Sequence, residues 1–411
     1  MADNVRDTEP KKENKSRKIK LINAVIAIIL TNLFTASVLI FAPIPFVGGK
    51  KIVSNDEYEF LKQFKKMIYV KEIVKSQYVD KIDENKMVDG ALKGMVEGIG
   101  DRYTVYMDQQ EFDALKTHTG GSYAGIGIYI DEKDGKIVVV APIEGSPAEK
   151  AGIKSGDFII KVNGIDVTAK DMEKAVSMMK GKVGTKVKVT IYREGKGLKD
   201  YELTRAKIII PSIKNEMLKD KIGYIRITNF DENTADSFMK ALNKLKAEGM
   251  NGLIIDLRDN GGGLLDQATD IADELLGKGT IVYTIDKNGE RLDWTSDENK
   301  LNMPLVLLVN GGTASASEIL SGAVRDFKAG VLIGTKTFGK GLVQTVIDLK
   351  DGTGVKVTTS RYYTPSGECI QGKGITPDIV LELPTKDTDR EITKEEDIQL
   401  KKAIEVIKPK R

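Results

Sequence analysis

Residues 304–318 read Pro-Leu-Val-Leu-Leu-Val-Asn-Gly-Gly-Thr-Ala-Ser-Ala-Ser-Glu. The apolar first part is typical of a buried strand in a layered α/β protein, and it ends in glycines and other small residues. A helix is expected from about residue 316 to residue 327, because Thr313 or Ser315 can cap it and Glu318 falls in its first turn. Ser315 is therefore predicted to lie where a strand turns into a helix.

A serine hydroxyl on such a turn suits a nucleophile, because the unpaired N–H groups at a helix start can stabilise an anion beside it. The chain contains one histidine, His118, so a Ser-His-Asp triad would depend on that residue alone. Lysine also activates serine when burial lowers its pKa. Lys340, which lies between two glycines, is the candidate base. Gln344 shares its face in an extended segment and could orient the amine.

Ser315, Lys340 and Gln344, with the residues around them, resemble the site of the carboxy-terminal processing peptidases, also called tail-specific proteases. These are serine peptidases with a Ser-Lys(-Gln) site and a PDZ domain. The similarity runs from about residue 103 to residue 378, and Thr313 stands where the family usually has serine. The resemblance implies an α/β protease core similar to the crotonase and Clp peptidase folds, with layered sheets and helices.

The same resemblance implies an oxyanion hole. One N–H group would come from Ala316, which follows the nucleophile, and the other from Gly261 or Gly262 in a glycine turn after the strand at 252–257. Glycine lets the backbone approach closely enough to offer such a donor. The carboxylates of Asp256, Asp259 and Glu318 could be mistaken for an acid/base pair or for metal ligands. We expect them to be structural hydrogen-bonding groups instead.

Residues 334–340 also fit the G-x-x-x-x-G-K pattern of a nucleotide-binding P-loop. A P-loop needs Ser or Thr at the next position to bind magnesium, and this chain has Gly341 there. The sequence therefore favours the peptidase interpretation over nucleotide binding.

Composition excludes several other classes. Lys and Arg number 63 against 60 Asp and Glu, so no charge bias points to nucleic acid. One cysteine, Cys369, allows no internal disulfide, and one Cys with one His leaves no zinc cluster. No metal and no cofactor are expected.

Residues 118–207 contain short β-branched runs separated by glycine and asparagine turns, and they resemble a PDZ domain. Its carboxylate-binding loop would be Gly125-Ile126-Gly127-Ile128. Glycines free backbone N–H groups to hold a terminal carboxylate, and the adjoining strand edge accepts the peptide as an added strand. The expected partners are proteins and peptides with free C-terminal tails.

The N-terminus predicts a membrane segment. Residues 1–20 are polar and basic, and residues 21–42 carry no charge. As a helix, that apolar run would span about 33 Å at ~1.5 Å per residue, enough for the hydrocarbon core. We predict a cytoplasmic basic tail at 1–20, a single-pass transmembrane anchor at 21–42 and an extracytoplasmic remainder. A cleaved signal peptide is the alternative, which the length of the run and Pro43 disfavour.

Three further segments complete the organisation. Residues 52–117 show helical apolar stripes that must bury against the core or a second subunit, as a cap or as the dimerisation region of a homodimer. Strands and helices alternate from residue 208, which predicts a largely parallel sheet covered by helices in a peptidase core at 208–384. A charged segment at 385–411 carries a last helix.

The sequence as a whole predicts a membrane-anchored, extracytoplasmic serine endopeptidase that cleaves near protein C-termini. The alternative is a PDZ adaptor that binds C-terminal tails and has an inactive or latent core.

Overall fold

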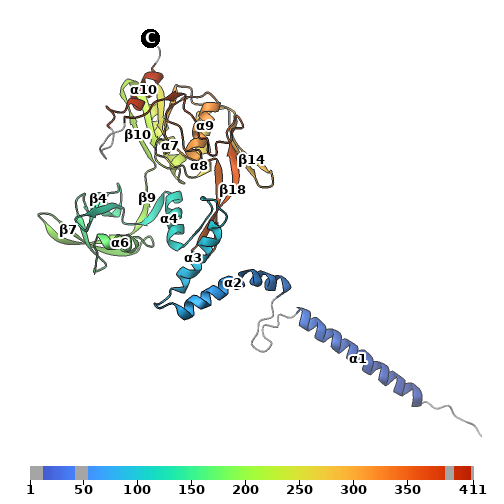
Figure 1. The fold of residues 1–411 in the computed structure, drawn as a ribbon. Coiled ribbons are helices and arrows are strands. Elements are labelled where there is room, and N and C mark those ends of the chain that lie inside the picture. The colour runs from blue at the N-terminus through green and yellow to red at the C-terminus, as the bar shows by residue number, and fades with distance from the viewer. Residues whose placement is uncertain (1–12, 42–53, 385–392, 409–411) are drawn as a thin grey trace, which may run out of the picture. The chain divides into compact units, whose positions relative to one another are not determined.

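The computed structural model describes residues 13–41, 54–384 and 393–408 (Figure 1), and the chain divides into two compact units between residues 87 and 88. Parts of the predicted segments lie outside these ranges: residues 1–12 of the basic tail, residue 42 of the anchor, residues 52–53 of the helical region, and 385–392 and 409–411 of the last segment.

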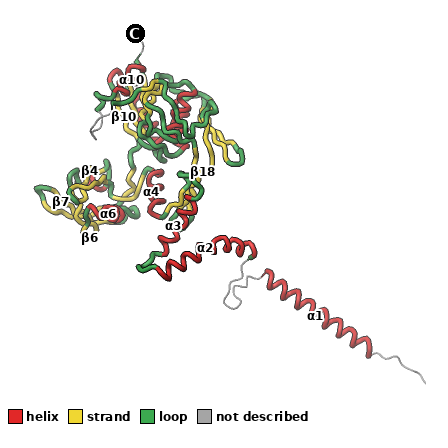
Figure 2. The backbone as a smooth tube through the Cα atoms, viewed as in Figure 1, coloured by secondary structure: helices red, strands yellow, loops and turns green. Residues whose placement is uncertain are grey.

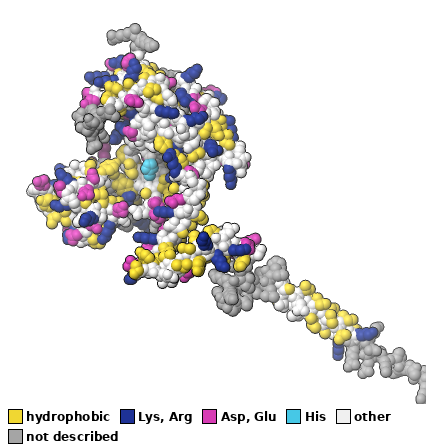
Figure 3. All heavy atoms as spheres, in the orientation of Figure 1, with side chains coloured by type: hydrophobic (Ala, Val, Ile, Leu, Met, Phe, Trp, Pro, Cys, Tyr) yellow, Lys and Arg dark blue, Asp and Glu magenta, His cyan; other side chains and the backbone are white. Residues whose placement is uncertain are grey.

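The first unit is helical. Helix α1 (Glu13–Phe41) contains a stretch, Lys18–Ser37, that is long and apolar enough to cross a membrane, with a mean hydropathy of 1.9 and none of it buried. Hydrophobic side chains cover this helix in Figure 3. Length and composition of this kind are shared by membrane anchors and signal sequences.

Helix α2 (Asn55–Gln77) begins with a capping box, in which Ser54 and Glu57 each accept the other's backbone N–H. The predicted apolar stripe is present on it, and these side chains are exposed: Tyr58, Leu61, Met67, Ile68, Tyr69, Val70 and Ile73.

The helical pattern predicted for residues 52–117 is interrupted by a strand. After α3 (Glu84–Glu97), strand β1 (Val105–Met107) precedes α4 (Gln109–Gly120). Strand β1 pairs antiparallel with β18 (Gly354–Tyr363), and its Tyr106 and Met107 are buried. The β-branched and aromatic residues of this short run fit a sheet edge better than a helix.

Residues 122–209 form a β-rich part with its own core (Figure 2). A two-stranded ladder of β2 (Ser122–Gly125) and β9 (Ala206–Ile209) flanks a six-stranded sheet in the order β3-β4-β5-β7-β8, with β6 beside β5. The sheet strands are β3 (Ile128–Lys133), β4 (Lys136–Pro142), β5 (Phe158–Val162), β6 (Ile165–Asp166), β7 (Lys186–Arg193) and β8 (Gly197–Thr204), and the helices are α5 (Pro147–Lys150) and α6 (Met172–Met179). The strands and helices follow the order expected of a PDZ domain.

The core contains the predicted parallel sheet, in the order β10-β11-β12-β15-β16-β19, in which only β10 and β11 are antiparallel. Its strands are β10 (Ile213–Met217), β11 (Ile222–Ile227), β12 (Gly252–Asp256), β15 (Leu305–Val309), β16 (Val331–Gly334) and β19 (Ile379–Val380). Every residue of β12 and β15 is buried, as the continuous apolar runs predict.

Helices cover both faces of this sheet (Figure 1). One face packs on α7 (Thr234–Ala247), α8 (Leu265–Leu275) and α9 (Ala316–Asp326), and the other on α10 (Ile398–Ile407). Neighbouring residues of one strand serve opposite faces, because side chains alternate along a strand: Ile255 lies in the first cluster and Ile254 in the second.

A second sheet of five strands lies in the same unit, in the order β1-β18-β13-β14 with β17 also pairing β18. Its remaining strands are β13 (Gly279–Asp286), β14 (Arg291–Ser296) and β17 (Leu342–Asp348). Strand β17 begins two residues after Lys340, so this sheet anchors the lysine segment.

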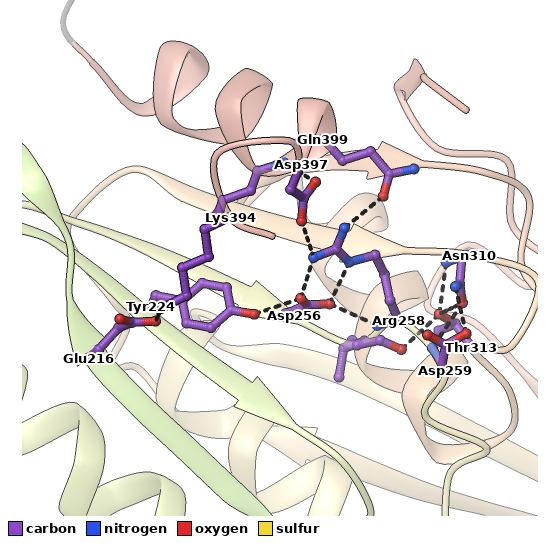
Figure 4. A network of polar contacts seen from close by, with 12 residues as sticks. Glu216, Tyr224, Asp256, Arg258, Asp259, Asn310, Thr313, Lys394, Asp397 and Gln399 are labelled. Atoms are coloured by element: carbon purple, nitrogen blue, oxygen red, sulfur yellow. Dashed lines mark hydrogen bonds and ion pairs between the residues drawn. The ribbon is translucent and has the colours of Figure 1, made fainter. Parts of the chain in front are cut away.

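A buried ionic network, which we call the C-terminal clamp, fastens α10 to the end of β12 (Figure 4). The Arg258 guanidinium donates to Asp256 at 2.6 and 2.9 Å and to Gln399 Oε1 at 3.0 Å, and it pairs with Asp397 at 2.8 Å. Tyr224 donates to Asp256 at 2.7 Å. The expectation that Asp256 is a structural hydrogen-bonding group is confirmed.

We expect Asp397→Ala to destabilise the protein by about 3 kcal/mol, because removing one partner of a buried pair leaves a buried charge short of its partner. The change also removes the N-cap of α10, whose Leu400 N–H donates to Asp397 at 2.9 Å. Thermal unfolding of the full chain in detergent measures this.

The matched control is Lys394→Ala, which breaks an exposed pair with Glu216 on the same side of the core. Exposed pairs contribute little, so this variant should unfold close to the unaltered chain. Equal losses in the two variants would contradict the clamp.

Candidate active site

Ser315 lies between β15 and α9, where the sequence predicts it. Its backbone has φ 56° and ψ −119°, and a positive φ of this kind is strained for a serine. Its carbonyl accepts the N–H groups of Glu318 at 2.8 Å and Ile319 at 3.0 Å, so α9 starts directly from the strained residue. Its own N–H donates to the Glu318 carboxylate at 3.0 Å.

The neighbouring turn after β12 is organised by Asn260, which is fully buried. Its Nδ2 donates to the Ile227 carbonyl at 2.8 Å, and its Oδ1 accepts the Gly262 N–H at 2.9 Å. Its carbonyl accepts the Ala314 N–H and the Ser317 hydroxyl, both at 3.0 Å. Asn260 therefore shapes the glycine turn and fastens it to the serine turn.

A second set of bonds joins the same two turns (Figure 4). Asn310 Oδ1 accepts the Asp259 N–H at 2.9 Å, and Asn310 Nδ2 donates to Asp259 Oδ1 at 2.8 Å. Thr313, which stands where the family usually has serine, donates through its hydroxyl to the Leu257 carbonyl at 2.9 Å. The turns are adjacent because β12 and β15 are neighbouring parallel strands.

Gly262 lies directly against the serine. A Cβ added at this position would lie 2.6 Å from the Ala314 carbonyl oxygen, 2.8 Å from Ser315 Cβ and 2.9 Å from the Ala316 nitrogen. Its φ of 99° also favours glycine. Gly262 uses its N–H in the bond to Asn260, whereas no hydrogen bond from the N–H of Gly261 or Ala316 is present among the described residues.

Lys340 lies on the segment between β16 and β17 and is half-buried. Burial lowers its pKa below the ordinary value of 10.5; the charges of Lys356 and Arg102 lower it further, while Asp101 and Glu318 oppose the change. Gly341 lets this segment pass close to the chain at Gln371, because a Cβ there would lie 2.7 Å from the Gln371 nitrogen.

One cavity of about 490 Å³ collects the predicted site residues. Its lining includes Ser315, Ala316, Lys340, Gln344, Gly261, Gly262 and also His118, the single histidine. Leu264, Ile319, Leu342 and Val343 give it an apolar part. The serine turn, the glycine turn and the lysine segment therefore face the same space.

Glu318 connects the serine turn to the lysine segment. This fully buried carboxylate accepts hydrogen bonds from the Ser315 N–H at 3.0 Å, the Gly339 N–H at 2.8 Å and the Lys340 N–H at 2.9 Å, and from the Thr337 hydroxyl. Its place three residues after Ser315 is a capping-box position, which accounts for the first bond. The other three bonds come from a distant segment and have no local sequence signal.

In the structure described, the side chains of Ser315 and Lys340 are not hydrogen-bonded to each other. No bond between Ser315 Oγ and Lys340 Nζ is present in the described part of the chain, and Lys340 Nζ lies 4.8 Å from the centroid of the Tyr103 ring. Gln344 Nε2 lies 3.4 Å from Thr358 Oγ1 rather than at the lysine. Here the side chains share a cavity without forming a closed Ser-Lys-Gln chain.

The predicted carboxylate-binding loop borders a second, apolar cavity of about 230 Å³. Ile126, Gly127 and Ile128 line it, whereas Gly125 ends β2. Gly127 has φ 77°, and its carbonyl accepts the Ser146 hydroxyl at 3.0 Å. Ile126 is also part of the core of this domain.

Comparison with known proteins agrees with this architecture. Family models match at residues 221–381 for peptidase family S41, at 138–193 for the PDZ domain and at 48–111 for the N-terminal domain of the activating protease CtpB.

Whole-chain relatives extend the match. The carboxy-terminal processing protease CtpA of Bacillus subtilis (strain 168) is 41% identical over 376 residues, which cover 91% of this chain and 78% of that protein. A carboxy-terminal-processing protease of Bartonella bacilliformis is 38% identical over 360 residues, covering 85% and 82%. The structure of the photosystem II D1 C-terminal processing protease is 32% identical with a TM-score of 0.46, covering 81% of this chain and 96% of that one. The chain therefore belongs to the carboxy-terminal processing proteases of peptidase family S41, and it is a serine-type peptidase.

Proposed function

We propose that this peptidase is a membrane-anchored, extracytoplasmic endopeptidase that cleaves proteins near their C-termini with Ser315 as nucleophile and Lys340 as general base. The observation that carries the proposal is the shared cavity, in which a strained serine and a half-buried lysine are held by one carboxylate, Glu318. Burial lowers the pKa of this lysine, as a general base requires.

The chemistry is acyl transfer. Neutral Lys340 takes the proton from Ser315 Oγ, the oxygen attacks the scissile carbonyl, and Lys340 then protonates the leaving amine. Water repeats the cycle and releases the acyl group from the serine. Lys340 must first swing from the Tyr103 ring toward Ser315, and Gln344 can then orient its amine.

We assign the oxyanion hole to the N–H groups of Ala316 and Gly261. Gly262, the other candidate, is engaged by Asn260, and its role is to let the glycine turn approach the nucleophile. Each donor aimed at a developing oxyanion typically contributes about 3 kcal/mol to the transition state.

In this proposal the PDZ domain binds the C-terminal tail of the substrate. A free C-terminal carboxylate would bind backbone N–H groups of the loop at 125–128, and the last side chain would enter the apolar cavity beside Gly127. The partners are therefore proteins with accessible, apolar C-terminal tails. The alternative function, a tail-binding adaptor with a latent core, shares this recognition step and differs only in cleavage.

The composition of α1 and of the residues before it supports the proposed location. Basic residues precede its apolar stretch, which favours a cytoplasmic N-terminus and a catalytic part on the other side of the membrane. The exposed apolar face of α2 is where a second copy of the chain could pack to form a homodimer.

Ser315→Ala and Lys340→Ala should each lower cleavage by at least ~10⁴-fold, because nucleophile and base act as a unit. The measurement is cleavage of a carrier protein with an unstructured, apolar C-terminal tail by the full chain in detergent.

Tail binding by the same three proteins is the control, and it should be unchanged. Cleavage by purified Ser315→Ala would rule out the nucleophile. Binding without cleavage by the unaltered chain would favour the latent adaptor.

Glu318→Gln should lower kcat by about 100-fold with little change in KM, because the amide nitrogen cannot accept a hydrogen bond and would displace the serine turn or the lysine segment by a fraction of an ångström or more. Steady-state cleavage kinetics measure the two constants. Glu368→Gln, at a partly exposed pair with Arg325, is the matched control. An unchanged kcat for Glu318→Gln would contradict the connecting role.

Lys356→Gln should move the acid limb of the pH–rate profile to higher pH. Lys356 is a like charge that disfavours the ammonium form of Lys340, so its removal raises the Lys340 pKa and a higher pH is needed to obtain the neutral base. The profile of kcat/KM measures the change. Lys350→Gln, an exposed lysine, is the control; a Lys356→Gln limb that stays in place or moves to lower pH would contradict the assignment.

A further inference from the structure

The ring of Tyr103 is the immediate neighbour of the proposed base. Lys340 Nζ lies 4.8 Å from the ring centroid, within the range of a cation–π contact. The same amine makes no hydrogen bond to Ser315 within the described residues, although both line one cavity. In this conformation the lysine therefore binds the ring instead of the serine.

Tyr103 is fixed in this place by its own turn. Asp101 accepts the Tyr103 N–H at 3.0 Å and the Thr104 hydroxyl at 2.6 Å. Thr104 Oγ1 in turn accepts the Thr358 N–H of β18 at 3.0 Å. Strand β1 follows immediately and pairs with β18, so the turn is bound to the same strand that carries Lys356.

Arg102, the residue before Tyr103, contacts both the Tyr103 ring and the lysine segment. Its guanidinium lies 4.7 Å from the Tyr103 ring centroid and 5.3 Å from that of Phe338, and it donates to the Tyr103 hydroxyl. Phe338 is two residues before Lys340. The ring and the lysine segment are thus held together by contacts besides the one to the amine.

The contact depends on the protonation state of the lysine. A ring face attracts an ammonium group through its quadrupole, and it attracts a neutral amine much more weakly. The other groups that act on the amine are Lys356 and Arg102, which disfavour the charge, and Asp101 and Glu318, which favour it; His118 lines the same cavity.

We propose that Tyr103 is a positioning residue for the peptidase reaction: its ring holds the ammonium form of Lys340 away from Ser315, and loss of the proton releases the amine to the serine. Proton loss and arrival of the base at the nucleophile are then one coupled event. This inference rests on the proposed role of Lys340 as general base.

The test compares Tyr103→Leu with Tyr103→Phe in the full chain in detergent. Leucine keeps an apolar side chain at the site and removes the quadrupole, whereas phenylalanine keeps the ring face and loses only the hydroxyl and its bond to Arg102. The readout is kcat/KM for the tail-bearing substrate as a function of pH, together with the rate at which a fluorophosphonate probe labels Ser315.

Without the ring, the ammonium form is less stable and the neutral base appears at lower pH. We expect the acid limb of Tyr103→Leu to move to lower pH in both readouts. At a pH well below the limb, and with each rate divided by that protein's own plateau rate, Tyr103→Leu should be roughly threefold faster than the unaltered chain. The acid limb of Tyr103→Phe should keep its midpoint. Lys356→Gln moves the limb in the opposite direction and shows that the assay resolves both signs.

An acid limb that stays in place in Tyr103→Leu, or that moves equally in Tyr103→Leu and Tyr103→Phe, would overturn the proposal. So would a lowered plateau without a shift, which is what a purely structural role produces. If Tyr103→Leu does not fold, Tyr103→Met replaces it under the same criteria.

Lys340→Ala distinguishes failure of the role proposed for Tyr103 from failure of the role proposed for Lys340 as general base. Activity that survives Lys340→Ala would refute the general base itself. An unmoved acid limb in an enzyme that requires Lys340 would refute only the role of Tyr103.

Discussion

The arrangement of this site depends on one buried carboxylate. Glu318 is fully buried, and a carboxylate in the interior is tolerated only when hydrogen-bond donors surround it. Those donors come from the serine turn and from the lysine segment, at 2.8 to 3.0 Å for the three backbone N–H groups. Satisfying these carboxylate oxygens therefore requires both segments to be in place at once, so one set of hydrogen bonds sets the spacing between nucleophile and base.

The backbone of the serine turn is strained, and contacts with neighbouring residues must stabilise it. Ser315 and, across from it, Asp259 both have positive φ values, 56° and 61°, at positions that are not glycine. Such conformations persist only where neighbouring contacts determine them. Asn260 and Asn310 supply those contacts by bonding each turn to the other. The rigidity of the site is thus a property of two turns together.

Local patterns were enough to predict much of this molecule. Apolar runs ending in glycine predicted the buried strands β12 and β15, the helix after Ser315, and the parallel sheet. What the sequence could not supply were contacts between segments that only the topology brings together: the bonds from Glu318 to 339 and 340, the engagement of the Gly262 N–H by Asn260, and the approach of Tyr103 to Lys340. The strand at 105–107 was missed for the same reason, since its partner lies about 250 residues later.

The C-terminal clamp makes the sheet depend on residues that follow the serine and lysine segments in the chain. Ser315 and Lys340 precede Asp397, the second carboxylate of the buried arginine, in the sequence. Without the segment that contains α10, one face of the sheet lacks its cover and Arg258 lacks two of its partners, Asp397 and Gln399. Undocking of α10 would therefore expose an apolar face of the sheet and remove two partners of a buried arginine in a single step, although α10 carries none of the proposed catalytic residues.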